Sequence, residues 1–183
     1  MTLALVACGE KKDDTKTDGA GDGEKTYKVA MICDSSINDG GWGAACYNAM
    51  IAAAEKMGWE TEVTDSISQD AYYDSIVAYC TLGYDMIYAI ATPAALSAYS
   101  AANKSDIPVI FCAVSDPVAA GLTESLEAGY NNCNGTSDIL DFSAQVDLIQ
   151  SIQPDVKKIG VLYTTTEANS MSQLESFKAV CTE

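Results

Sequence analysis

Short apolar segments alternate with longer amphipathic segments along most of the chain, and this alternation restricts the possible folds more than any other feature. Runs such as "DMIYAI" and "VIFCAV" have the length and composition of buried strands. The predicted strands cover residues 27–33, 59–64, 85–90, 109–114 and 157–163. The predicted helices cover residues 43–57, 69–82, 93–103, 141–152 and 167–180, with a short helix at 118–126. Such repeats predict an α/β fold with a doubly wound parallel sheet, helices on both faces and right-handed crossovers.

Glycine, threonine and proline residues indicate where several predicted helices begin or end. Gly58 and Gly83 each follow a helical pattern and have the usual helix-ending role. Thr92 is predicted to cap the third helix, with Pro93 as its first residue. These local signals agree with the hydrophobic pattern.

The character of the chain changes after residue 128. Residues 27–132 hold four predicted strands and form a predicted N-terminal lobe. Residues 133–183 begin polar and turn-rich and then hold one main predicted strand, so we interpret them as the opening of an incomplete C-terminal lobe. A complete second lobe needs roughly another hundred residues. We therefore expect the chain to be part of a longer, two-lobed protein.

The charge composition restricts both the partners and the chemistry. The net charge is −16, so nucleic acid and anionic lipid headgroups are not expected as partners. The chain has no histidine, and all of its basic residues are lysines, which excludes Ser-His-Asp catalysis, histidine-bound metals and bidentate arginine clamps. A bound anion would depend on backbone N–H groups or lysine. No cofactor is predicted, since "INDGGWG" lacks the glycine spacing of a dinucleotide site.

Residues 1–26 have the pattern of a lipoprotein N-terminus. "MTLALVAC" is followed by Gly9 and resembles a bacterial lipobox, with Cys8 as the lipidated residue. Because the apolar run is short and no basic residue precedes it, we expect residues 1–8 to be the end of a longer signal peptide. Residues 9–26 are rich in Gly, Asp and Lys, which predicts a disordered tether. These segments predict an extracytoplasmic protein whose N-terminal lipid alone holds it on the bacterial cell membrane.

Three polar loops follow predicted strands at their carboxyl ends, and they read "DSSINDGGW", "ATPA" and "VSDP". Ligands of open parallel sheets bind beyond this edge, so the convergence of three such loops predicts a binding site. Thr92, at a predicted helix N-terminus, and Ser115 are candidates for holding a ligand carboxylate, and Asp116 for holding a ligand ammonium group. A helix cap and a Ser-Asp-Pro turn are the structural alternatives for these residues.

Longer stretches resemble two related families of binding lipoproteins. "YKVAMICDSSINDGGWGAACYNAMIAAAEKMGWE" with "LGYDMIYAIAT" resembles the basic membrane lipoproteins of ABC transporters. "DIPVIFCAVSDPVAAGLTESLE", together with "NGTSD", "IGVLY" and "EANS" in order, resembles substrate-binding lipoproteins associated with aromatic or other hydrophobic amino acids. Both resemblances imply a type I periplasmic-binding architecture of two lobes, a hinge and a ligand in the cleft. They also imply an ABC importer as partner, with a nucleoside or an amino acid as solute.

The resemblance also assigns residues of the first loop. Asn38 and Asp39 are implied as polar ligand contacts and Trp42 as a residue that stacks on a ring of the ligand, with Ser36 in the same loop. The structural alternatives are that Asp39 caps a helix and that Trp42 packs in the core. Further candidates lie at the expected hinge and in the C-terminal lobe, where turn formation and capping are the alternatives: Thr136, Ser137, Asp138, Thr165, Glu167 and Asn169.

Two functions of different classes fit these patterns. The preferred one is a lipoprotein that captures a small ring-bearing solute, an amino acid or a nucleoside, between its lobes and delivers it to the permease subunits of an ABC importer. The alternative is a two-lobed, cofactor-independent racemase or isomerase with Cys33 and Cys112 as paired acid and base. The seven cysteines include no CxxC pair, and most are predicted to be small buried hydrophobes.

Overall fold

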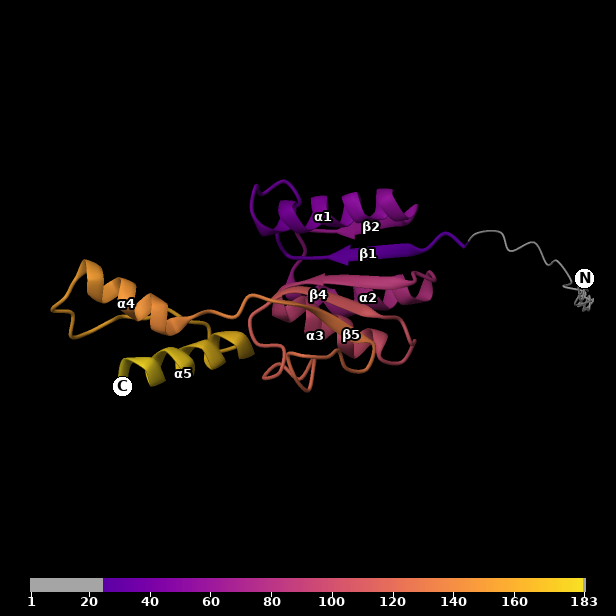
Figure 1. Cartoon of the computed structure of the whole chain (residues 1–183). Coiled ribbons are helices and arrows are strands. Elements are labelled where there is room, and N and C mark those ends of the chain that lie inside the picture. The colour runs from indigo at the N-terminus through magenta and orange to yellow at the C-terminus, as the bar shows by residue number, and fades with distance from the viewer. Residues whose placement is uncertain (1–24, 183) are drawn as a thin grey trace, which may run out of the picture.

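The structure, a computed structural model, describes residues 25–182 of the chain (Figure 1). Its elements are β1 (Lys28–Ile32), α1 (Trp42–Met57), β2 (Glu60–Thr64), the short 3-10 helix η1 (Gln69–Ala71), α2 (Tyr72–Thr81), β3 (Met86–Ile90), α3 (Ala91–Ala102), β4 (Val109–Val114), β5 (Cys133–Ser137), α4 (Phe142–Ile152) and α5 (Ala168–Thr182). The predicted lipidation site Cys8 and most of the predicted tether lie outside the described residues. No helix within residues 25–182 is long and apolar enough to cross a membrane.

The strands form one sheet in the order β2-β1-β3-β4-β5, and all neighbouring strands are parallel. In Figure 1, α1 lies on one face of this sheet, while α2 and α3 lie on the other. Helices α1, α2 and α3 each connect two strands, and because all the pairs are parallel, the carboxyl ends of the strands lie at the same edge. This arrangement confirms the predicted α/β fold with a doubly wound parallel sheet.

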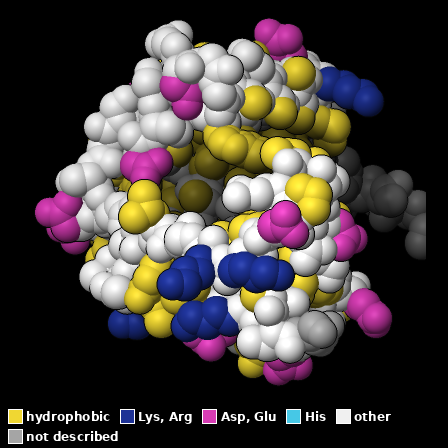
Figure 2. Space-filling view, turned by 90° about the vertical axis from the view of Figure 1, so that its left-hand side faces the viewer, with side chains coloured by type: hydrophobic (Ala, Val, Ile, Leu, Met, Phe, Trp, Pro, Cys, Tyr) yellow, Lys and Arg dark blue, Asp and Glu magenta, His cyan; other side chains and the backbone are white. Residues whose placement is uncertain are grey.

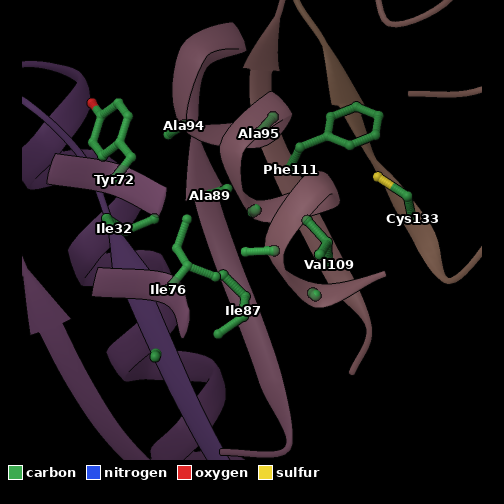
Figure 3. Close-up of a cluster of buried hydrophobic side chains, with 14 of the residues drawn as sticks. Ile32, Tyr72, Ile76, Ile87, Ala89, Ala94, Ala95, Val109, Phe111 and Cys133 are labelled. Atoms are coloured by element: carbon green, nitrogen blue, oxygen red, sulfur yellow. The ribbon is translucent and has the colours of Figure 1, made fainter. Parts of the chain in front are cut away.

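The main core lies between the sheet and the pair of helices α2 and α3. Side chains of a strand alternate between its two faces, and Ile87 and Ala89 of β3 point toward this core. Figure 3 shows Ile76 of α2 and the two alanines Ala94 and Ala95 of α3 against these strand residues. The small alanine side chains let α3 approach the sheet closely.

A second, smaller core lies between the sheet and α1. It contains Met31 of β1, Cys46 and Met50 of α1, and the partly buried Cys112 of β4. Successive side chains of a strand therefore point into two different cores, one covered by α2 and α3 and the other by α1.

The C-terminal part of the chain extends beyond the carboxyl ends of the strands (Figure 1). Helix α4 begins at the predicted place, and the Asp141 carboxylate accepts a hydrogen bond from the Ala144 N–H at 3.0 Å. Helices α4 and α5 contact each other through Phe142 and Phe177, whose ring centroids are 5.8 Å apart. These two helices therefore lie next to the edge of the sheet that is formed by the carboxyl ends of the strands.

Residues 133–137 form a strand that the sequence did not predict, because "CNGTS" is polar and contains a glycine. The strand, β5, pairs with β4 in parallel. A side chain at Gly135 would collide with the backbone of Phe111, so the glycine permits the close approach of the two strands. The segment predicted to open the C-terminal lobe therefore begins with a strand of the N-terminal sheet, and the lobe boundary at 132 stays a prediction.

The predicted helix at residues 118–126 is wrong. The segment forms consecutive turns, in which the N–H groups of Ala120 and Leu122 donate to the carbonyl groups of Asp116 and Pro117. Gly121 has a φ of +73°, a left-handed conformation that ends a helix. Only the first of these bonds has the spacing of an α-helix, and the segment does not continue into one.

The predicted strand at residues 157–163 is also wrong for the described structure. The segment is mostly exposed and pairs with no strand within residues 25–182. An apolar run becomes a strand only when neighbouring strands satisfy its backbone groups and cover its side chains. The hydrophobic pattern "IGVLY" supplies the side chains but not these neighbours.

Candidate ligand site

The carboxyl ends of β1, β3, β4 and β5 lie next to one another, because these strands are neighbours in a parallel sheet. The three polar loops that follow β1, β3 and β4 therefore lie along one edge, as the sequence predicted. Figure 2 views the molecule from this side and shows a hollow with hydrophobic side chains inside it. At this edge Ala91 has a φ of +69° and Ala113 a φ of +56°. Such strained backbone conformations in non-glycine residues cluster at functional sites.

Asp39 caps the first turn of α1. Its carboxylate accepts hydrogen bonds from the backbone N–H groups of Gly41 at 2.7 Å, Gly43 at 3.2 Å and Ala44 at 3.0 Å. These bonds, that of Ala44 first, lower the pKa of Asp39 below its ordinary value. The cap that the sequence offered as the structural alternative is thus present. A carboxylate has about four acceptor positions, so a ligand contact by Asp39 stays a prediction.

The Asp39 cap predicts a pH-dependent stability. Because the pKa of Asp39 is depressed in the folded chain, its stabilisation is complete above the ordinary carboxyl pKa of about 4 and is lost as the pH falls through the lower folded value. Asp39→Ala is expected to lower the urea midpoint of unfolding by about half a molar at neutral pH, and by less in acid. Urea titrations followed by circular dichroism at both pH values measure this difference.

The exposed Asp147 of α4 is the matched control, and Asp147→Ala is expected to leave the urea midpoint almost unchanged. Equal losses in the two variants, or a loss for Asp39→Ala that does not shrink in acid, would contradict the assigned cap.

Trp42 does not pack in the core. It is the first residue of α1, and its side chain is 60% exposed. Two hydrogen bonds hold the loop before it. Within the loop, the Asn38 N–H donates to Ser36 Oγ at 3.1 Å, and from the segment after β2, an Asp65 carboxylate oxygen accepts from the Ile37 N–H at 3.0 Å. An ordered loop thus presents an indole with a large free surface at the edge where a ligand is expected.

Thr92 does not cap α3, contrary to the prediction. The helix begins at Ala91, two residues earlier than a Thr92 cap requires, and Pro93 is its third residue rather than its first. Thr92 is only 3% exposed, and its Oγ1 atom is buried without a hydrogen-bond partner in the described part of the chain. An unpaired buried hydroxyl costs about 1–3 kcal/mol. A ligand or water that bonded Oγ1 would remove this cost, which keeps Thr92 among the predicted contacts.

The "VSDP" segment joins β4 to the C-terminal part of the chain. Asp116 accepts two hydrogen bonds through its carboxylate, one from the Ala119 N–H at 2.8 Å and one from the Ser172 hydroxyl of α5 at 2.9 Å. The Ser115 carbonyl accepts a hydrogen bond from the Ser137 hydroxyl at 3.3 Å. The turn that was the structural alternative is formed, and it also brings Ser115, Asp116 and Ser137 together.

A pocket of about 280 Å³ lies beside Asp116. Its lining residues come from the "VSDP" turn and the segment after it, the β5–α4 connection, the start of α4, and α5: Ser115, Asp116, Val118, Leu126, Ile139, Leu140, Phe142, Ser172, Gln173 and Ser176. A mostly apolar lining with a few polar groups is typical of small-molecule sites, which start at roughly 300 Å³. Trp42 and the other first-loop candidates do not line this pocket, so the structure does not bring the two groups together.

The remaining predicted residues lie in different surroundings. One side-chain oxygen of Asp138 and one of Asn169 are buried without a partner among residues 25–182, so both have free bonding capacity. Thr136 and Thr165 are exposed. Glu167 precedes α5, and its carbonyl group accepts a hydrogen bond from the Met171 N–H at 3.3 Å. A ligand role for each of these residues stays a prediction.

The polar residues that α5 contributes to the pocket were not among the predicted site residues. Ser172, Gln173 and Ser176 follow Asn169 by three, four and seven positions. Residues at this spacing share one face of a helix. The predicted helix and the candidate Asn169 together were therefore a sufficient signal for the polar face.

The surroundings of Cys33 weaken the racemase alternative. Cys33 is fully buried, and its thiol donates a hydrogen bond to the Ser35 carbonyl group at 3.2 Å. Burial raises the pKa of the Cys33 thiol. A buried thiol with a raised pKa is a poor base and a poor nucleophile at neutral pH.

A family model described as ABC transporter substrate binding protein matches residues 63–183, well over half of the chain. The chain belongs to the ABC transporter substrate-binding protein family. The match includes the whole C-terminal stretch on which the sequence resemblance to substrate-binding lipoproteins rested. The family consists of binding proteins rather than enzymes, in agreement with the preferred class of function.

This substrate-binding protein is similar to one curated relative and to several solved structures. It is 50% identical over 92 residues to the "Tyrosine-binding protein" of Clostridioides difficile (strain R20291), an alignment that covers 50% of this chain and 26% of that protein. It also resembles the structure of an ABC domain in complex with L-Trp from Streptococcus pneumonia, with 30% identity, a TM-score of 0.75, and coverage of 85% of this chain and 53% of that one.

A further similar structure is the ligand-free, open form of a substrate binding protein with adhesive properties from Clostridium difficile. The identity is 30% and the TM-score 0.65, with 86% of this chain and 54% of that chain covered. The substrate-binding protein described here therefore spans about half the length of these solved structures and about a quarter of the curated relative.

Proposed function

We propose that this chain takes part in capturing an aromatic amino acid, tyrosine or tryptophan, for an ABC importer. The observation that carries the proposal is the 50% identity over 92 residues to a protein named for binding tyrosine. The similar structure with L-Trp supports the same class of solute. Between the two classes of solute that the sequence left open, these findings favour an amino acid over a nucleoside.

The proposed contacts follow the chemistry of an aromatic amino acid. Trp42 offers an exposed indole face on which an aromatic ring can stack. Asp116 lies beside a pocket and keeps acceptor capacity for an ammonium group, even with its two hydrogen bonds in place. The buried Oγ1 of Thr92 has no partner within the described residues and is suited to a carboxylate. The ligand is thus proposed to bind between the sheet edge and the C-terminal lobe.

The setting of the protein belongs to the same proposal. A lipid on Cys8 would anchor the protein to the outer face of the cell membrane. The tether would let the folded part of the chain reach permease subunits of the importer. The strongly acidic surface is compatible with this location, because anionic lipid headgroups repel it from the bilayer.

A titration of the ¹⁵N-labelled chain with L-tyrosine tests the proposed solute. The chain has two tryptophans, Trp42 and Trp59, so its NMR spectrum has two indole N–H signals. Trp59 packs against Tyr27 with ring centroids 6.0 Å apart and serves as an internal control. We expect the Trp42 signal to shift with saturation at roughly millimolar ligand, because the chain spans only half of its solved relatives, and the Trp59 signal to stay in place.

L-Alanine and adenosine are the matched ligands for this titration. L-Alanine carries the ammonium and carboxylate groups without a ring, and adenosine carries a ring without them, so both are expected to shift the Trp42 signal far less. Trp42→Ala should weaken the shifts that L-tyrosine causes around Asp116. Saturable binding of adenosine without binding of L-tyrosine would overturn the proposed class of solute.

A further inference from the structure

Two cysteines from distant parts of the chain touch each other beneath α1. Cys46 lies in α1 and Cys112 in β4, 66 positions later, and the Cys46 thiol donates to Cys112 Sγ over 3.8 Å. Both belong to the smaller core on the α1 face of the sheet. No set of three or more potential metal ligands gathers anywhere in residues 25–182, so a metal does not explain this pair.

Formation of a disulfide bond requires a closer approach of the two sulfur atoms. A disulfide bond has an S–S distance of about 2.05 Å, so the two sulfurs must move toward each other from their 3.8 Å contact. A cavity of about 210 Å³ lies on the same side of the sheet, between Ala49 and Ala53 of α1 and Tyr88 and Ile110 of β3 and β4. The layer between α1 and the sheet is therefore not completely filled.

The exposure of the two thiols sets the order of the chemistry. Cys112 is partly exposed, whereas Cys46 is only 4% exposed. Burial and the neighbouring Cys112 thiol raise the pKa of Cys46 to about 11. Cys112 is therefore the thiol that first meets an oxidant, and Cys46 is the slower, resolving thiol.

We propose that Cys46 and Cys112 are a disulfide-forming pair that ties α1 to β4 when the protein meets a small-molecule disulfide. The Cys112 thiolate attacks one sulfur of that disulfide, which breaks its S–S bond and releases one thiolate. The Cys46 thiolate then attacks the Cys112 sulfur in the mixed disulfide and releases the second thiolate. The two protein thiols lose two protons and two electrons, and the small disulfide is reduced to two thiols.

The position of this crosslink links it to the proposed ligand site, a consequence that rests on the proposed function. Cys46 follows Trp42 by four positions, and Cys112 precedes Ser115 by three. A bond between them would fix the spacing of the β1–α1 loop and the "VSDP" turn. The redox state of the pair would then determine how rigidly these two walls of the site are held.

Oxidised glutathione at about pH 8.5, where thiolates form more readily, tests the proposal. The experiment uses a variant with Cys8→Ser and Cys181→Ser, so that the exposed Cys181 cannot form a disulfide between two molecules. After alkylation and digestion, mass spectrometry is expected to find a Cys46–Cys112 peptide pair about 2 Da below the sum of the reduced peptides. Closure of this loop should also raise the thermal midpoint by about 5–10 °C.

Two further variants test whether the crosslink is specific to Cys46 and Cys112. Cys112→Ser should abolish the crosslinked peptide and the thermal shift, whereas Cys80→Ser, a partly exposed cysteine on α2, should leave both unchanged. The proposal is overturned if wild-type Cys46 and Cys112 stay alkylatable after oxidation, or if Cys112 stops at the mixed disulfide. Since the thiol measurement needs no ligand, it can fail or succeed independently of the tyrosine titration.

Discussion

Gly135→Ala is expected to lower the free energy of unfolding by about 3 kcal/mol or more. A Cβ atom at this position would collide with the Phe111 carbonyl oxygen and with Phe111 Cδ2. The first of these atoms belongs to the backbone of the neighbouring strand and cannot rotate away. The pairing of β4 and β5 must therefore open to admit one methyl group. Urea denaturation followed by circular dichroism measures the loss.

Gly160→Ala is the matched control for this substitution. A Cβ atom at Gly160 meets no heavy atom within 4 Å, and the substitution is expected to change the free energy of unfolding by less than about 0.5 kcal/mol. If the two variants unfold at the same urea concentration, β5 is not packed against β4 as described. The same result would remove the structural basis for placing Ser137 beside Ser115.

Ile87→Ala is expected to cost about 2–5 kcal/mol of folding free energy. Ile87 lies in the central strand β3, is 0% exposed, and packs in the core that α2 and α3 cover (Figure 3). Truncation to alanine removes three carbon atoms from water-free surroundings and leaves a cavity, because the neighbouring strands and helices fix the positions of the surrounding side chains. Thermal and urea unfolding report the change.

Ile152→Ala makes the same chemical change at a position that is 77% exposed, at the end of α4. Its expected effect is below about 0.5 kcal/mol. Comparable losses at Ile87 and Ile152 would show that the described core does not determine the stability of the chain. A large loss at Ile87 alone would establish the β3 core as the platform on which the edge loops stand.

The sheet contains four strands that the sequence predicted, β1, β2, β3 and β4, and one that it did not, β5. β1 is almost completely buried, and β3 and β4 are buried on one face and partly buried on the other, so their apolar runs are continuous and visible in the sequence. β5 lies at the edge of the sheet, and it forms because β4 offers hydrogen-bonding partners and Gly135 permits close contact. The run at residues 157–163 is the reverse case: it is apolar and was predicted as a strand, but no strand within the described residues pairs with it.

The candidate site likewise has features that the sequence predicted and features that only the tertiary structure shows. The loops after β1, β3 and β4 were found because a parallel sheet must place them at one edge. The hydrogen bond between Asp116 and Ser172 joins residues 56 positions apart, and no local pattern specifies such a contact. The predicted Thr92 cap followed from a preference for threonine at helix starts, but α3 begins at Ala91, so Thr92 is the buried second residue of the helix.

The sequence alone determined the fold class, the sheet edge that carries the polar loops, and the resemblance to substrate-binding lipoproteins, because hydrophobic periodicity and short motifs are local properties of a chain. The tertiary structure decided which of those loops meet. It joined Asp116 to α5, left Trp42 exposed beside a capped helix, and brought Cys46 into contact with Cys112. Contacts of this kind depend on strand order and close packing across the sheet, and these are fixed only when distant segments assemble.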